Sequence, residues 1–493
     1  MPIDVFDSFI SIFPNNALPK AGIDKISAEK YFDVQTRKPT KKGYDLIMYV
    51  EKLFMNSDLF DNFKFSPFAE MLILKGANKV PRRVSKPTIK DKLVLKVLLE
   101  IITEVPEYRQ LQSHASTVIP KIRTSLSASQ SSLSYLSMDI SSFFDNINHK
   151  ILLDQLQIDG KLDSHIIRLI RKAIEGITVP FGFSKRDYSD VTNVIGVPQG
   201  LSISNILAEI YLRAFDSSII SYIDTMPSKA FYFRFVDDIL LLSQSYLDLC
   251  SMKEHITNQL GLYKLSINQE KTRLDVLTDN TSFKYLGYQF SRNKISIAGK
   301  NIIKIETRLI EIIKEIRRLC DRNILEHDQI YFRLMWRLNI IISGAWMDGK
   351  HFGWIDYFQN ITCTRQLSHL DDVLKSKLIP TYLGKTYAAE YYLFENSNLQ
   401  NINSFLADIP LAYRHWMNHL KSFVKVFDEK RHKQPQQYQQ IININNYSDA
   451  MKRNILTCIS DNSIKWNEYS INYIFTEQIY SEVQKLTNGF RFS

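Results

Sequence analysis

Residues 231–243 read FYFRFVDDILLLS, and this stretch decides the fold of the chain around it. Two β-prone runs flank a bare pair of aspartates, Asp237 and Asp238, which predicts a hairpin with both carboxylates at its tip. Acidic turns are common at protein surfaces, but both flanking runs are too apolar to be surface strands. Because unpaired carboxylates on a buried hairpin are costly unless a cation compensates them, the pair indicates a metal site.

A partner for this pair lies upstream in SYLSMDISSFFDNINHKIL, residues 134–152. A strand-like run ends at Asp139, and a helical or turn segment follows it. With Asp139 at a strand end beside Asp237, the site would consist of oxygen ligands, which suits Mg²⁺. Two such ions about 3.5–4 Å apart can activate a 3′ hydroxyl and stabilise a departing pyrophosphate. We interpret Asp145 as a helix-start or capping residue.

The segment GVPQGLSISNILAEIYLRAFD, residues 196–216, predicts a tight loop followed by an amphipathic helix. Gly196 and Gly200 mark the loop, and Ser202 or Ser204 is expected to cap the helix. A glycine-bearing loop before a helix often binds phosphate and is as often only a turn, so this segment alone leaves both interpretations open.

In chain order, MDISSFFDNINH, GVPQGLSISNILAEIYL and FRFVDD resemble the palm motifs of reverse transcriptases. Upstream, PRRVSKPTIKDKLV resembles the fingers motif of that family. Downstream, LSINQEKT (265–272) resembles the lysine-bearing motif after the catalytic hairpin, and FKYLGYQF (283–290) resembles the primer-grip hairpin. The resemblance covers roughly residues 75–290, and the order of its motifs makes it far more specific than any single motif.

The resemblance implies catalytic and metal-binding roles at one set of positions. The implied catalytic residues are Asp139, Asp237 and Asp238. The implied metal-binding positions are Asp139, Ile140, Asp237 and Asp238, with Mg²⁺ as the cofactor and dNTPs as the substrates.

A second set of positions is implied to contact the incoming nucleotide. Arg82, with Lys79 as a companion, would hold the triphosphate as a charge clamp. Gln199 and Gly200 would line the minor-groove and backbone side of the nucleotide.

Phe144 and Lys271 complete that set, and each has an alternative. Phe144, five residues after Asp139, stands at the steric-gate position, where a ring under the sugar excludes a 2′-hydroxyl; the alternative is a plain core aromatic. Lys271 would protonate the pyrophosphate; the alternative is a solvated surface lysine.

The chain departs from the common family pattern at several places. Phe235 and Val236 stand where the family usually has Tyr-Ala or Tyr-Val, and Leu201 and Asn205 replace the Ser and Pro frequent in intron-encoded enzymes. No maturase, endonuclease or RNase H pattern follows. The long helical C-terminus resembles that of bacterial abortive-infection (Abi) and other defence-associated reverse transcriptases, some of which extend DNA from a protein tyrosine while others copy a non-coding RNA.

We therefore expect an α+β fold of the right-hand polymerase type, with fingers, palm and thumb and an α-helical C-terminal domain. The expected divisions are an N-terminal extension (1–65), fingers and palm (66–290), a helical thumb-like region (291–380) and the C-terminal domain (381–493). A helix after Gly299 is predicted by apolar residues at spacings of three and four, namely Ile302, Ile305, Leu309, Ile312, Ile316 and Leu319.

The composition of the chain limits the partners, the metal sites and the cellular location that can be expected. The 493 residues carry 62 Lys+Arg against 52 Asp+Glu, a net charge of +10 that suits a polyanionic partner without requiring one. The 4 cysteines lie far apart without a CxxC pair, which argues against a zinc site and a disulfide framework. The acidic N-terminal stretch and the lack of a long apolar run predict a soluble, cytoplasmic protein with no membrane partner.

The predicted function is DNA synthesis from dNTPs, RNA-directed or template-independent, in antiphage defence. The expected partners are a DNA product, dNTPs and a non-coding RNA template, and self-association stays open. The alternatives are a retron- or intron-type reverse transcriptase, a catalytically idle RNA- or protein-binding scaffold, and an RNase resembling HEPN nucleases through Arg414 and His419. Priming by a tyrosine hydroxyl is a further expectation, with Tyr44, Tyr438 and Tyr447 as candidates.

Overall fold

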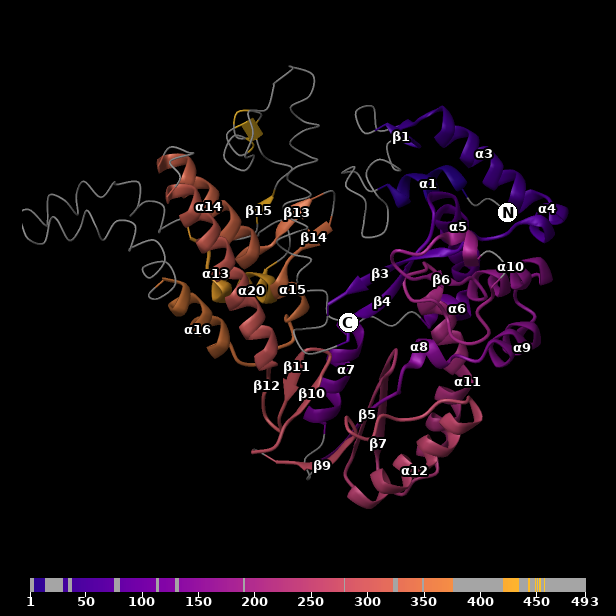
Figure 1. Ribbon diagram of the computed structural model, residues 1–493. Helices are drawn as coiled ribbons and strands as arrows, with labels where there is room; N and C mark the ends of the chain where they lie inside the picture. The colour runs from indigo at the N-terminus through magenta and orange to yellow at the C-terminus, as the bar shows by residue number, and fades with distance from the viewer. Residues whose placement is uncertain are drawn as a thin grey trace, which may run out of the picture. The chain divides into compact units, whose positions relative to one another are not determined.

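The computed structural model describes most of the chain up to residue 375 and a few segments beyond it (Figure 1). The described residues are 4–13, 30–33, 38–74, 80–111, 115–128, 133–188, 191–278, 280–321, 327–347, 350–375, 420–433, 442–443, 448, 450, 452–453 and 456. The chain divides into two compact units, Met1–Phe283 and Lys284–Ser493. The structure is a mixture of helices and strands, so the α+β class is confirmed.

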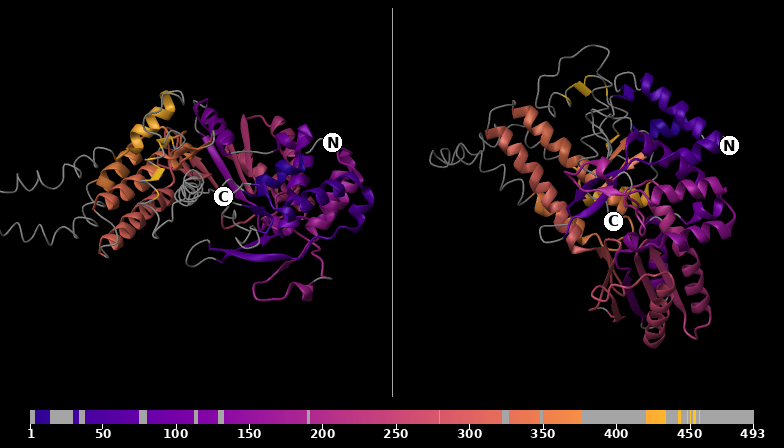
Figure 2. Two further views of the ribbon diagram at one scale, coloured as in Figure 1. Left: turned by 90° about the horizontal axis from the view of Figure 1, so that it is seen from above. Right: turned by 45° about the vertical axis from the view of Figure 1, so that its right-hand side comes forward.

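An antiparallel four-stranded sheet organises the first unit. In spatial order its strands are β7 (Ala230–Phe235), β8 (Asp238–Ser243), β5 (Leu133–Asp139) and β9 (Arg273–Leu277). Helices α11 (Ser204–Asp224) and α12 (Tyr246–Leu262) pack against this sheet, and Figures 1 and 2 show them beside it. The inner strand β8 is apolar between its two end residues, and Leu240, Leu241 and Leu242 are fully buried.

A smaller sheet carries the segment that resembles the fingers motif. Strand β3 (Phe68–Ile73) pairs antiparallel with β4 (Arg82–Lys86) and parallel with the short strand β6 (Thr178–Val179). The pairing with β6 ties this hairpin to residues far downstream in the chain. Lys79 lies outside the described residues.

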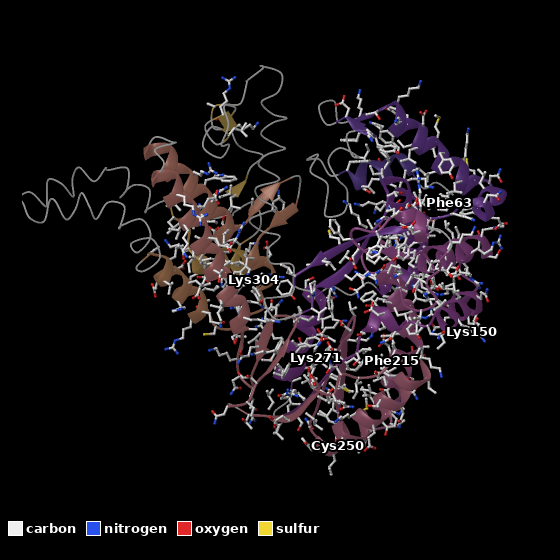
Figure 3. The ribbon with its side chains drawn as sticks, in the orientation of Figure 1. Phe63, Lys150, Phe215, Cys250, Lys271 and Lys304 are labelled. Carbon is white, nitrogen blue, oxygen red and sulfur yellow. The ribbon has the colours of Figure 1, made fainter. Side chains whose placement is uncertain are left out.

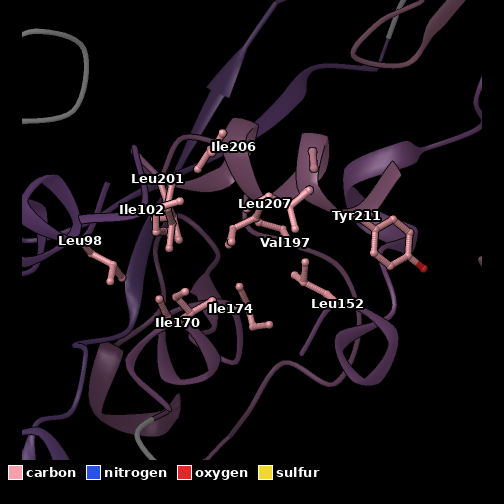
Figure 4. Packing of buried hydrophobic residues seen from close by; sticks show 14 of the residues in the cluster. Leu98, Ile102, Leu152, Ile170, Ile174, Val197, Leu201, Ile206, Leu207 and Tyr211 are labelled. Carbon is pink, nitrogen blue, oxygen red and sulfur yellow. The ribbon is translucent and has the colours of Figure 1, made fainter. Parts of the chain in front are cut away.

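The core of the first unit forms where helices meet beneath the glycine-bearing loop (Figure 4). Figure 4 shows apolar side chains from four helices and that loop converging: Leu98, Ile102, Leu152, Ile170, Ile174, Val197, Leu201, Ile206, Leu207 and Tyr211. Removing side chains of this kind from water is the main favourable contribution to folding. The loop is therefore anchored to the core by its own residues Val197 and Leu201, which are almost fully buried.

The remaining elements of the first unit are mainly helices. They are α1 (Val5–Ile12), α3 (Lys41–Met55), α4 (Ser57–Asn62), α5 (Ile89–Glu104), α6 (Pro106–Gln110), α7 (Ala115–Ser127), α8 (Phe143–Asn146), α9 (His149–Asp159), α10 (Ser164–Ile174), the 3-10 helix Lys185–Tyr188 and the strand pair β1 (Phe32–Asp33) and β2 (Lys38–Pro39). Both α1 and α3 contact α5, so the described part of residues 1–65 shares the core of this unit.

The second unit begins within β10 (Phe283–Tyr285), which forms a small sheet with β11 (Tyr288–Phe290) and β12 (Ile295–Ile297). Two long helices follow, α13 (Gly299–Asp321) and α14 (His327–Ser343). The predicted helix after Gly299 is confirmed, and Ile305, Leu309 and Ile312 lie buried on its apolar face. The later elements are β13 (Ala345–Met347), β14 (Lys350–Phe352), α15 (Trp354–Tyr357), α16 (Arg365–Val373), α20 (Phe423–His432) and β15 (Ile442–Asn443).

One sequence expectation differs from this picture, and another falls mostly outside the described residues. Residues 291–380 are not purely helical, because β12, β13 and β14 lie among them. Most of residues 381–493, including Arg414, His419, Tyr438 and Tyr447, lie outside the described residues. Within the described part of the chain, no helix combines the length and the apolar character that crossing a bilayer requires.

Candidate active site

The predicted hairpin is confirmed, with the aspartate pair at its tip. Strand β7 ends at Phe235, β8 begins at Asp238, and these two residues pair across the turn that Val236 and Asp237 form. Val236 has φ +57°, in the left-handed region that β-branched residues rarely adopt. The turn that presents Asp237 is therefore strained.

Asp139 reaches the same end of the sheet from the neighbouring strand. It is the last residue of β5 and pairs with Asp238 in the antiparallel register of β5 and β8. Just beyond it, the Ile140 N–H donates to the Asp237 carbonyl oxygen at 3.1 Å. Backbone pairing thus places all three predicted catalytic aspartates at the same end of the sheet.

Lys271 reaches this group from the segment after α12. Ile267 forms an isolated antiparallel bridge with Ile140, and the Asn268 N–H donates to the Asp139 carbonyl oxygen at 2.7 Å. The Asn268 side chain then accepts from the Lys271 N–H at 3.3 Å, closing a turn. From this turn the Lys271 ammonium (labelled in Figure 3) lies 2.7 Å from Asp139 Oδ2.

The electrostatics of these groups are coupled. Burial raises the pKa of Asp237, and the charge of Asp139 raises it further, whereas Lys271 and Arg82 lower it. The hydrogen bond to Asp139 raises the pKa of Lys271, as do the charges of all three aspartates. Arg82, half-buried on β4, therefore acts on the same site from the smaller sheet.

The donor set fits a magnesium site, although the carboxylates do not converge on one point in this conformation. Within the described ranges, no three His, Cys, Asp or Glu side chains are close enough together to hold a metal ion. Carboxylate oxygens are the ligands that Mg²⁺ prefers, and a cation would offset the cost of burying Asp237 beside Asp139. The Ile140 side chain is 1% exposed and apolar, so Ile140 can contribute only its backbone.

The glycine-bearing loop lies against the smaller sheet. The Ser85 N–H of β4 donates to the Gln199 carbonyl oxygen at 2.6 Å. Gly200 has φ +103°, and a Cβ there would lie 2.5 Å from Val84 Cγ1 and 2.8 Å from the Ser85 carbonyl oxygen. Only glycine combines this backbone conformation with this close approach, so Gln199 and Gly200 are positioned by contact with β4.

The other end of the loop is bonded to the segment after Asp139. The Gly196 N–H donates to the Ile147 carbonyl oxygen at 2.8 Å, and the Val197 N–H donates to the Phe144 carbonyl oxygen at 2.7 Å. The structure therefore places Phe144, Gln199 and Gly200 in one neighbourhood.

Phe144 lies in the short helix α8, and its side chain is 9% exposed. Its ring centroid is 5.5 Å from that of Phe143, which is also buried. This burial is compatible with a core aromatic and with a gate that the nucleotide sugar would contact. The assignment of Phe144 as a gate stays a prediction.

The sequence predicted residues at the start of two helices, α8 and α11, and only the prediction for α8 is confirmed. Asp145 lies in the first turn of α8, as expected, and its carboxylate accepts from Gln199 Nε2 at 3.5 Å. The prediction that Ser202 or Ser204 caps the next helix is wrong. Ile203 occupies the cap position, and its hydrocarbon side chain cannot form a capping hydrogen bond. The Ser204 hydroxyl donates to the Pro198 carbonyl oxygen at 2.6 Å.

A cavity of about 460 Å³, which no sequence pattern predicts, adjoins this neighbourhood. Its lining includes Arg83, Asp145, Tyr188, Asn193 and Gln199. Asn193 Nδ2 donates to the Gly196 carbonyl oxygen at 3.0 Å and so connects the cavity wall to the glycine-bearing loop. No motif marks residues 176–195, so no sequence signal pointed to this wall.

Comparison with known protein families shows what this part of the chain is similar to. Residues 73–290 match the family described as reverse transcriptase (RNA-dependent DNA polymerase). This part of the chain is similar to reverse transcriptases. A domain of this family implies nucleotidyltransferase activity, so the enzyme class predicted from the sequence is confirmed at the level of the family.

Two curated relatives are intron proteins. A 91 kDa protein in the cob intron of Schizosaccharomyces pombe is 32% identical over 167 residues, which cover 32% of this chain and 19% of that protein. The COX1/OXI3 intron 1 protein of Saccharomyces cerevisiae is 23% identical over 303 residues, which cover 50% of this chain and 35% of that protein. The chain thus spans about a third or less of the relatives it matches. Neither relative's name mentions abortive infection, so the Abi assignment gains no support from them.

Solved telomerase structures show a weaker likeness to the chain. A telomerase from Candida albicans with a fragment of telomeric RNA has a TM-score of 0.40 and 13% identity, covering 90% of this chain and 69% of that one. An apo telomerase from Candida tropicalis has a TM-score of 0.39 and 12% identity, covering 92% and 78%. These scores are too low for any part of the function to rest on them.

Proposed function

We propose that the chain is an RNA-directed DNA polymerase that adds dNTPs to a 3′ hydroxyl. The observation that carries this proposal is the meeting of Asp139, Asp237 and Asp238 at one end of the sheet, inside the part of the chain that is similar to reverse transcriptases. Bound between these carboxylates, Mg²⁺ would activate the 3′ hydroxyl and stabilise the charge of the departing pyrophosphate.

The cationic residues of the site would act on the phosphates of the nucleotide. Arg82 lies close enough to change the pKa of Asp237, which supports a role in binding a triphosphate held over the carboxylates. Lys271 carries a proton that all three aspartates stabilise. On leaving Asp139 it would donate this proton to the pyrophosphate, which is general acid catalysis.

The base and sugar of the nucleotide would lie against α8 and the glycine-bearing loop. Gln199 and Gly200 would contact the nucleotide's minor-groove and backbone side, and Phe144 would lie under its sugar. Support for this arrangement comes from the backbone hydrogen bonds that tie the loop both to β4 and to Phe144.

We also propose the right-hand division of the chain. The β3–β4 hairpin would belong to the fingers, the four-stranded sheet to the palm, and α13 and α14 to the thumb. The order of the motifs along residues 73–290 and the pair of long helices after them support this assignment.

An intron-type enzyme is better supported than an antiphage effector. Both curated relatives are named as intron proteins, whereas the defence assignment rests on a resemblance of residues 381–493. The partners we propose are an RNA template, a DNA product and dNTPs. Tyrosine priming has one candidate among the described residues, Tyr44, which is 45% exposed.

The test is synthesis by the purified full-length chain with Mg²⁺ and dTTP, on poly(rA) annealed to oligo(dT). Extension that requires both template and primer is the expected result. Extension without a template would replace RNA-directed synthesis with template-independent synthesis. No incorporation under either condition would favour the scaffold interpretation. Label that stays with the protein after denaturation and disappears on nuclease treatment would reveal a tyrosine primer.

A further inference from the structure

A buried arginine lies within the hairpin that carries Asp237. Arg234 is in β7, two residues before the turn residue Val236, and its side chain is 5% exposed. Its guanidinium donates from Nη2 to Glu209 Oε2 at 2.7 Å and from Nε to Asp216 Oδ1 at 2.8 Å. A second bond from Nη2 reaches Asp216 Oδ2 at 2.5 Å. The arginine therefore bridges two carboxylates of helix α11.

Both carboxylates are largely shielded from solvent and are hydrogen-bonded within the protein. The side chains of Glu209 and Asp216 are 10% and 21% exposed. The Tyr232 hydroxyl, two residues before Arg234 on the same strand, donates to Asp216 Oδ1 at 2.6 Å. Burying charged groups is costly, and a hydrogen-bonded network of this completeness is what offsets that cost.

The cluster also bonds the backbone carbonyl of Val236. Arg234 Nη1 donates to the Val236 carbonyl oxygen at 2.9 Å. Burial raises the pKa of Glu209, and the nearby backbone N–H of Val236 acts in the opposite direction. A strained backbone conformation persists only where its surroundings fix it, and here the cluster fixes the strained residue of the turn.

We propose that Arg234, Glu209 and Asp216 form a positioning cluster that holds Val236 in its left-handed conformation and thereby places the Asp237 carboxylate. The inference rests on the proposed function, because it assigns these residues to the metal site of a polymerase. We assign none of the three a contact with the substrate, because their side chains are 5%, 10% and 21% exposed. They act through the backbone carbonyl of Val236, next to the residue that carries the carboxylate.

Lysine cannot replace Arg234 in this role. Lysine keeps the positive charge, but its single ammonium group cannot bond two carboxylates and the Val236 carbonyl in the planar fork geometry of a guanidinium. The variant Arg234→Lys therefore keeps the positive charge of the cluster and removes the hydrogen bonds that position Val236.

The test compares the full-length wild type with Arg234→Lys, Val236→Gly and the double variant on poly(rA) and oligo(dT). In Arg234→Lys we expect kcat to fall about 100-fold because the carboxylate is misplaced. We expect KM for dTTP to stay within about twofold, because nucleotide binding is not the affected step. The Mg²⁺ concentration that gives half the maximal rate should rise.

The double variant distinguishes positioning from fold stability. Glycine adopts a positive φ without strain, so adding Val236→Gly to Arg234→Lys should recover at least about tenfold of the lost kcat. A role in stability alone would not be rescued, because Val236→Gly also removes a packed side chain. A double variant no faster than Arg234→Lys would overturn the proposal, as would a wild-type kcat in Arg234→Lys.

Arg213→Lys is the matched control. Arg213 lies on α11 and pairs with Asp159 on α9, away from the hairpin. This variant should lose stability without losing kcat.

A second measurement needs no enzymatic activity. Hydrogen exchange of a peptide covering residues 231–238 should become faster in Arg234→Lys than in the wild type, while a β5 peptide stays protected. Unchanged exchange in that peptide would contradict the positioning role, whether or not the wild type synthesises DNA. An inactive wild type with faster exchange in the variant would instead count against the proposed function alone.

Discussion

At the scale of single residues, we propose that Asp237 binds metal and does not stabilise the fold. We predict that the double variant Asp237→Asn, Asp238→Asn incorporates no nucleotide above background. Burial and the neighbouring Asp139 both raise the pKa of Asp237, so removing its charge relieves an unfavourable interaction. The melting temperature, followed by circular dichroism, should therefore be unchanged or higher.

The control for this variant is Asp154→Asn, which changes an exposed aspartate on α9 and should leave synthesis intact. Incorporation at the wild-type rate in the double variant would contradict the assignment of the hairpin carboxylates.

Phe144 allows a prediction about sugar selectivity. If its ring contacts the nucleotide sugar, Phe144→Val should raise the use of rNTPs relative to dNTPs by on the order of 10- to 100-fold. Primer extension with matched rNTP and dNTP series measures this ratio of kcat/KM.

Phe143→Val is the matched control, because Phe143 is a buried aromatic neighbour on the same helix. It should lower the melting temperature without changing sugar selectivity. A wild type that already uses rNTPs freely would show that Phe144 is a core residue.

At the scale of elements, the contact between the glycine-bearing loop and β4 should be sensitive to one methyl group. Gly200→Ala forces a Cβ into Val84 and the Ser85 carbonyl at a positive φ. We predict that the free energy of unfolding falls by about 1–3 kcal/mol, measured by urea denaturation, and that synthesis falls with it.

Gly261→Ala is the control, because it makes the same substitution at a position with space for the added Cβ. A Cβ at Gly261, inside α12, would meet no atom within 4 Å. This variant should be more stable by about 0.5–1 kcal/mol, because alanine favours helix. Equal effects of the two substitutions would show that the close approach at Gly200 has no energetic consequence.

The sequence predicted elements whose signals are local. The hairpin around Asp237 and the helix after Gly299 follow from strand-prone runs and from apolar spacing, and the structure has both. The strands β12 to β14 were missed because each has only three residues, too few for an alternating pattern.

Interactions between residues that only the folded chain brings together could not be predicted from the sequence. The Ser204 hydroxyl donates to Pro198 instead of capping its helix, a choice made by the fold of the loop. Arg234 lies inside an apolar strand. From this position the sequence predicts a buried arginine that is paired with carboxylates, but it does not identify them. Its partners Glu209 and Asp216 lie in the preceding helix, and only the packing of α11 on β7 reveals them.

At the scale of the whole molecule, the positive net charge predicts how binding depends on salt. The excess of 62 Lys+Arg over 52 Asp+Glu favours a polyanion, and each phosphate neutralised by the protein releases counterions. We predict that the affinity for a template–primer falls linearly in a plot of log K against log salt concentration, measured by filter binding between 50 and 200 mM salt. An affinity independent of salt would show that the basic excess does not contact nucleic acid.

The order of strands in the sheet has a consequence for how the chain is made. Strand β5 lies between β8 and β9, and both partners come later in the sequence. At roughly 5–20 residues per second, the ribosome needs on the order of 5–20 seconds after Asp139 to reach Asp238. Until then a nascent chain carries β5 with both edges open, and an apolar strand with open edges is a template for aggregation. Helix α12, which packs on β5, also comes later in the sequence. Chaperone binding during translation would therefore matter most in this interval.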